Sequence, residues 1–278
     1  MSTGPVPAMF GTQAAKPMYA AFYGELAPHA PQGEFSQDAY SLFYARSAAM
    51  GWLTPATEGA PGGLWGMNDA EASPGTGPPP QRVAFFQVTL TGLAPGGVLP
   101  AQPFLSCAGD VVARLGALRL EAVQVLLPGH ETPAGGDLAS PSSMRIARPL
   151  LESLNWFGDC DAQLRTPVRV TIDGGPDPSV RAAAPAIAQW AQEVRQDIFA
   201  CDQFSLAEGD HLVLQPTPLH EPGPSPHRVT FRGTLIEWSL DALGWLAAFV
   251  TDISSRHGVH TPLMLTADRT GAPGSPAG

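Results

Sequence analysis

The strongest constraint on the fold is a series of period-two and helical hydrophobic patterns that occurs twice along the chain. In the second half, Val168, Val170 and Ile172 alternate with polar residues, which predicts a half-buried strand. The predicted elements of this half are a strand at 168–172, a helix at 177–198, strands at 211–215 and 228–235, a helix at 239–256 and a strand at 263–267. Their order is β-α-β-β-α-β.

The first half repeats this order less regularly. Its predicted elements are a strand at 18–26, a helix from Ser36 to Ser47, a strand near Leu64 and Trp65, a strand at 82–91, a helix at 104–115 and a strand at 120–127. Two local similarities support a repeat. Arg82-Val83 opens a strand as Arg228-Val229 does, and residues 114–117 precede the last strand of their half as residues 256–259 do.

The repeated order resembles the ferredoxin-like, or split βαβ, pattern. We therefore predict an α+β protein built as a tandem ferredoxin-like repeat, a pseudo-dimer in one chain with Pro/Gly-rich tails and loops. The expected divisions are disordered tails at 1–16 and 269–278, ferredoxin-like halves at 17–130 and 148–268, and a linker at 131–147.

The charge of the chain limits its partners. Among 278 residues, 15 are Lys or Arg and 25 are Asp or Glu, which gives a formal charge of −10. Nucleic acids and anionic membrane surfaces need a clustered basic footprint, so neither is an expected partner, whereas a basic protein would be attracted. The sequence has no apolar stretch of membrane-spanning length and no signal-peptide pattern, and we expect a cytoplasmic protein.

Motifs of the common catalytic and cofactor sites are absent from the sequence. It contains no GxSxG, HExxH, P-loop or GxGxxG pattern, and His257 and His260 have no regular metal-ligand spacing around them, so we expect neither a cofactor nor a metal. The three cysteines lack CxxC spacing, as is typical of a reducing compartment. The carboxylates of Asp159 and Asp161 should raise the pKa of Cys160, which argues against a nucleophilic thiolate there.

Polar residues of the predicted strands form the candidate ligand site. In a ferredoxin-like sheet the first and third strands are neighbours, so their polar residues share one face. The candidate ligand-binding residues on this face are Arg169, Arg228, Thr230 and Arg232 in the second half and Tyr19, Tyr23 and Gln87 in the first. If the two sheets face each other, these side chains line one cavity suited to an anionic, partly aromatic small molecule. If the sheets do not face each other, the same residues form a solvated surface.

The helix predicted at 239–256 is apolar on two stripes, and the second, Trp245 and Phe249, must be buried against the other half or another chain.

Three functions stay open from the sequence. The first is a non-catalytic acidic protein-binding module, such as an inhibitor or immunity-type partner of a basic protein. The second is a small-molecule enzyme of dimeric α/β-barrel type, such as a cofactor-independent cyclase or oxygenase. The third is a structural subunit of an assembly.

Overall fold

The structure is a computed structural model, and it describes residues 16–29, 38–55, 62–74, 80–91, 97–129, 148–161, 163, 165–193, 198–206 and 227–270. The predicted linker and most of both predicted tails lie outside these ranges. Only the inner ends of the tails can be compared with the prediction. The first strand begins at Lys16 and the last ends at Arg269, so one residue of each predicted tail belongs to a strand.

The elements follow the predicted order in each half, except that two short helical elements, which were not predicted, precede the first strand of the second half. The first half contains β1 (Lys16–Pro28), α1 (Ala39–Ala49), β2 (Trp65–Ala72), β3 (Gln81–Leu90), α2 (Ala101–Leu115) and β4 (Gly116–Leu127). The second contains α3 (Arg148–Glu152), the 3-10 helix η1 (Ser153–Phe157), β5 (Thr166–Asp173), α4 (Ser179–Glu193), β6 (Phe199–Ser205), β7 (Val229–Leu235), α5 (Leu240–Arg256) and β8 (Leu263–Arg269). The predicted α+β class is confirmed.

All the strands form one antiparallel sheet of eight, in the order β2-β3-β1-β4-β8-β5-β7-β6. The two halves join edge to edge where β4 pairs with β8, from Ala122 opposite Asp268 to Leu127 opposite Leu263. Their sheet faces therefore lie side by side. The facing-sheet arrangement considered from the sequence is not adopted, because backbone hydrogen bonds between β4 and β8 continue the sheet from one half into the other.

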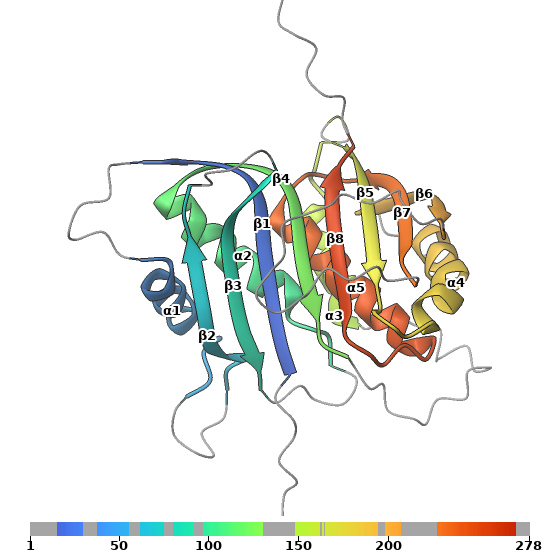
Figure 1. The fold of residues 1–278 in the computed structure, drawn as a ribbon, viewed down its shortest axis with the longest axis horizontal. Coiled ribbons are helices and arrows are strands. Elements are labelled where there is room, and N and C mark those ends of the chain that lie inside the picture. The colour runs from blue at the N-terminus through green and yellow to red at the C-terminus, as the bar shows by residue number, and fades with distance from the viewer. Residues whose placement is uncertain are drawn as a thin grey trace, which may run out of the picture.

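Helices cover one face of this sheet, as Figure 1 shows for α2 and α5. Alternate strand residues such as Met18, Ala20 and Phe22 pack against the helices in the main core, while Tyr19, Ala21 and other residues form a second, smaller apolar cluster on the opposite face. Period-two alternation thus places two different side-chain sets on the two faces. In the described part of the chain, no helix is long and apolar enough to cross a membrane.

The second apolar stripe of α5 is buried, as predicted, because α5 packs across both halves. It contacts α2 of the first half as well as α3 and α4 of the second. Trp245 and Phe249 are 0% and 1% exposed, and their rings stack with centroids 4.9 Å apart. The close crossing of α5 and α2 depends on Gly244, where a Cβ atom would lie 2.5 Å from the Cα of Gln102.

One predicted helix end in the second half is wrong, and one strand was missed. The helix expected to continue to Ile198 ends at Glu193, and a strand that was not predicted, β6, lies at Phe199–Ser205. The prediction extended the helix because the spacing of Ile187 and Ile198 fits one helical face. Residues 211–215 themselves lie outside the described residues, as does Ser36, the expected start of the helix that begins at Ala39.

Candidate functional site

The sequence-predicted ligand residues divide into two groups on the same sheet. Tyr19 pairs with Gln87 across β1 and β3, whereas Arg169 pairs with Arg232 across β5 and β7. The strands β4 and β8 lie between the two groups. At ~4.8 Å per strand, the nearest members of the two groups are about 14 Å apart. The groups therefore share a face without converging on one point.

Buried carboxylates neutralise two of the three predicted arginines. Arg169 donates from Nε and Nη2 to the two carboxylate oxygens of Asp268, each at 3.0 Å, and Arg228 donates from Nε to Asp173 at 2.7 Å. Both aspartates are 6% exposed. Such hydrogen-bonded pairs satisfy charges that would otherwise be costly to bury. These arginines therefore stabilise the sheet, and the binding of an anionic ligand to them stays a prediction.

Thr230 completes the same group, because its hydroxyl lies 3.3 Å from that of Thr171 on the neighbouring strand β5. Both threonines are buried. Cross-strand hydroxyl pairs of this kind stabilise antiparallel sheets. A structural contact thus accounts for the position of Thr230.

The hydroxyls of the two predicted tyrosines reach neighbouring strands, and only that of Tyr19 reaches the second half of the sheet. The hydroxyl of Tyr19 donates to the sulfur of Met264 on β8, and that of Tyr23 donates to Oε1 of Gln124 on β4, each at 3.4 Å. Both side chains are fully buried. Burial, and next the neighbouring Tyr19, raise the pKa of Tyr23 far above its usual value, while Arg82 opposes the shift. Tyr23 therefore remains a neutral hydrogen-bond donor at physiological pH.

A different surface, which the sequence analysis missed, is formed by α3, η1 and the turn after them. Trp156 on η1 is 71% exposed, the largest value among the big apolar side chains described, and Leu151 on α3 is 42% exposed. Exposed carboxylates lie within a few residues of both. We call this set the Trp156 surface, and it consists of Leu151, Glu152, Trp156, Asp159 and Asp161.

The segment that carries Trp156 is fixed to the core on its other side. Leu150 and Phe157 are each 3% exposed and belong to the main hydrophobic cluster. The backbone carbonyl of Leu150 also accepts a hydrogen bond from Nε1 of the buried Trp245, at 3.1 Å. These anchors hold the backbone, so the indole of Trp156 is presented from a fixed support.

Negative charge dominates around the Trp156 surface. The thiol of Cys160 lies 3.6 Å from a carboxylate oxygen of Glu237. Partial burial, the charge of Glu237 and its hydrogen bond, and then the charge of Asp159 raise the pKa of Cys160. The direction agrees with the prediction, although Glu237 contributes more than Asp159 and Asp161 is not among the causes. Arg148 pairs with Glu152 at 2.7 Å, and the carboxylates of Asp159 and Asp161 follow within the next nine residues.

This combination suits a cationic partner. The face of an indole attracts Lys and Arg side chains, and nearby carboxylates add Coulomb attraction and hydrogen bonds. The sequence carried a partial signal in Asp159-Cys160-Asp161, which the sequence analysis interpreted only for its effect on the thiol. The exposure of Trp156 had no local signal, because the adjacent Phe157 is equally apolar and buried.

Among all the described residues, no three His, Cys, Asp or Glu side chains lie close enough together to hold a metal ion. Comparisons of the chain with protein-family models, curated proteins and solved structures found no match.

Proposed function

We propose that the protein is a non-catalytic acidic protein-binding module, of the inhibitor or immunity type, and that its Trp156 surface docks a basic protein. The observation that carries this proposal is an indole 71% exposed on an anchored segment, with exposed carboxylates within a few residues of it in the sequence. Tryptophan is enriched among the residues that dominate binding energy at interfaces. The charge of −10 steers a basic partner toward the protein at long range.

The observations that favoured the two alternative functions have structural explanations. The arginines expected to hold an anionic small molecule include two that pair with buried aspartates. The apolar second stripe of α5, which favoured an assembly subunit, is buried against α2 and α3 of the same chain. Neither observation then requires an external ligand or subunit.

We also propose that each half is a ferredoxin-like unit. The order β2-β3-β1-β4 in one half and β8-β5-β7-β6 in the other supports this, because both have the first and third strands of the half in the centre. A cytoplasmic, reducing environment is proposed with it, since Cys107, Cys160 and Cys201 are all free thiols.

The binding proposal is tested with the full chain and a labelled Arg/Gly-repeat peptide as a basic probe, measured by fluorescence anisotropy at two salt concentrations. Trp156→Ala should weaken binding by about 30-fold, the effect of losing ~2 kcal/mol at an interface hot spot. Asp159→Asn should weaken binding several-fold at low salt and less at high salt. The fold should be unchanged by either substitution.

The matched control is Asp69→Asn, which removes one exposed carboxylate on β2. It should leave the affinity within about twofold of the original, since a distant exposed charge acts mainly on the association rate. Equal effects of Asp69→Asn and Asp159→Asn, with no effect of Trp156→Ala, would mean that the probe responds to net charge alone and would refute the proposed surface. Absence of binding would refute it as well.

A further inference from the structure

The outer strands of the described sheet are β2 at one end and β6 at the other, as Figure 1 shows. An outer strand has a neighbour on one side only, so its backbone N–H and C=O groups on the other side can pair with a strand of another chain. The structure of these two strands therefore decides whether the sheet can extend.

Each outer strand contains one extra residue relative to its neighbour. The register of β2 on β3 shifts at Asn68, and that of β6 on β7 shifts at Asp202. An extra residue of this kind is a β-bulge, which bends the strand and interrupts its ladder of hydrogen bonds. The regular stretches that remain are 65–67 and 69–72 on β2 and 199–201 and 203–205 on β6. None of them is longer than four residues.

The junction of the two halves shows how a regular stretch and a bulge differ. Residues 122–127 of β4 pair with residues 263–268 of β8 without a register shift. This pairing ends beside Glu121, which is the extra residue of β4 in its pairing with β1. In this chain, the strand edge that accepts another strand is longer and regular, and the pairing stops at a bulge.

Exposed carboxylates accompany the bulges of the outer strands. Asp202 is itself exposed, and the exposed Asp69 and Glu71 follow the bulge of β2. A second copy paired with either strand about a two-fold axis would present the same residues from the other side. Like charges would then lie on neighbouring strands, which destabilises the pairing.

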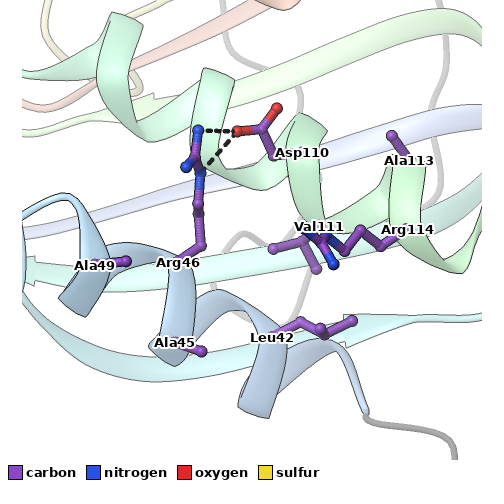
Figure 2. Close-up of a pocket in the computed structure, with 8 residues that line it drawn as sticks. All are labelled: Leu42, Ala45, Arg46, Ala49, Asp110, Val111, Ala113 and Arg114. Atoms are coloured by element: carbon purple, nitrogen blue, oxygen red, sulfur yellow. Dashed lines mark hydrogen bonds and ion pairs between the residues drawn. The ribbon is translucent and has the colours of Figure 1, made fainter.

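The bulged strands also lie on helices of the core, since β2 contacts α1 and β6 contacts α4. Phe43 of α1 is fully buried against Phe86 and Phe104, which fixes this helix on the core. Figure 2 shows a second connection, the ion pair between Arg46 of α1 and Asp110 of α2, with an N–O distance of 2.6 Å. The bulge of β2 therefore lies on a fixed support, which opposes rearrangement into a regular strand.

We infer that the bulges and carboxylates of β2 and β6 keep the described sheet from extending, so that neither a second copy nor a strand of a partner adds to it. The regular edges of the two halves, on β4 and β8, are already joined to each other. A partner of this protein is therefore bound through side chains and not by strand addition. The inference does not depend on the Trp156 surface.

Deletion of Asp202 tests the inference, because it removes the bulge and the carboxylate of β6 together. Sedimentation velocity over a series of concentrations should show a monomer for the original protein and an additional species of twice the mass for the deletion variant. In that variant, the amides of β6 should exchange hydrogen more slowly as the concentration rises, because an added strand protects them. Asp202→Asn is the matched control, since it removes the charge but keeps the extra residue, and it should remain monomeric.

A second variant tests the other end of the sheet. Deletion of Asn68 combined with Asp69→Thr makes β2 regular and removes the nearer carboxylate, and it should dimerise with slower exchange in β2. Circular dichroism identifies the variants that keep the fold, and if one deletion variant unfolds, the other decides.

A folded deletion variant that stays monomeric would overturn the inference. Dimerisation of the original protein with protected β2 or β6 amides would overturn it as well. Equal dimerisation of Asp202→Asn would have the same consequence, because the bulge would then block nothing. Trp156→Ala should leave the sedimentation of every variant unchanged, so this inference and the proposed function can fail separately.

Discussion

Replacing Trp245 with alanine tests how the core connects to the proposed docking segment. The side chain is fully buried, stacks on Phe249 and donates its indole N–H to the carbonyl of Leu150. Truncating a buried tryptophan costs about 3–5 kcal/mol, and leaving a buried carbonyl without its donor adds ~1 kcal/mol or more. We therefore expect Trp245→Ala to lower the free energy of unfolding by about 5 kcal/mol, a large share of the ~5–15 kcal/mol typical of a protein.

Urea unfolding followed by far-UV circular dichroism measures this loss, and two variants separate its causes. Trp245→Phe keeps an aromatic ring but removes the N–H donor, and should cost about 1–3 kcal/mol. Trp156→Ala removes the same residue type at a position 71% exposed, and should change stability by less than ~0.5 kcal/mol.

Hydrogen exchange extends the test to the docking segment. In Trp245→Phe, the amides of residues 150–157 should exchange faster, because the carbonyl of Leu150 loses the bond that holds α3 to α5. A free energy of unfolding within 1 kcal/mol of the original for Trp245→Ala would refute the argument, as would equal costs for Trp245→Ala and Trp156→Ala. Either result would mean that α5 is not packed as described.

Three further results are expected. Gly244→Ala should destabilise the protein by about 1–3 kcal/mol in a urea titration, because the new methyl group would meet the backbone of α2. This cost should exceed the gain from the higher helix propensity of alanine. A gain in stability would contradict the close helix crossing. Arg169→Met should cost about 3–5 kcal/mol by removing the guanidinium that pairs with the buried carboxylate of Asp268, and a thermal melt like that of the original protein would show that the pair is not needed. Cys160 should react with iodoacetamide more slowly at pH 8 than a free cysteine does, since its raised pKa lowers the thiolate fraction. Glu237→Gln should speed the reaction, and a rate insensitive to that substitution would disprove the electrostatic explanation.

Local features of the sequence predicted most of the elements. Alternation at 168–172 and 228–235 identified β5 and β7, because a strand with one apolar face has a period of two. Ser239 was a recognisable helix start, and its hydroxyl accepts the hydrogen bond from the amide of Ala242, at 3.1 Å. The strand β6 was missed because Phe199 and Cys201, its buried residues, follow a helix whose apolar spacing continues to Ile198.

The candidate site was less predictable, because its character depends on partners far away in the sequence. The shared sheet face of Arg169 and Arg232 followed from strand periodicity, and the structure confirms that they are opposite each other. The carboxylate that neutralises Arg169 comes from Asp268, 99 residues away, on a strand whose place in the sheet no local pattern specifies. The guanidinium of Arg169, which the sequence suggested for ligand binding, therefore pairs with a carboxylate of the same chain.

The sequence by itself determined the types and order of most of the elements, though not of α3, η1 and β6, and the residues that share each strand face. These follow from backbone geometry and the spacing of apolar side chains. Only the tertiary structure decided that β4 pairs with β8, which places the two sheet faces side by side instead of opposite each other. It also decided that Trp245 is buried and Trp156 exposed. Both outcomes depend on which helix and sheet surfaces pack together in the folded chain, and residue type alone does not specify that packing.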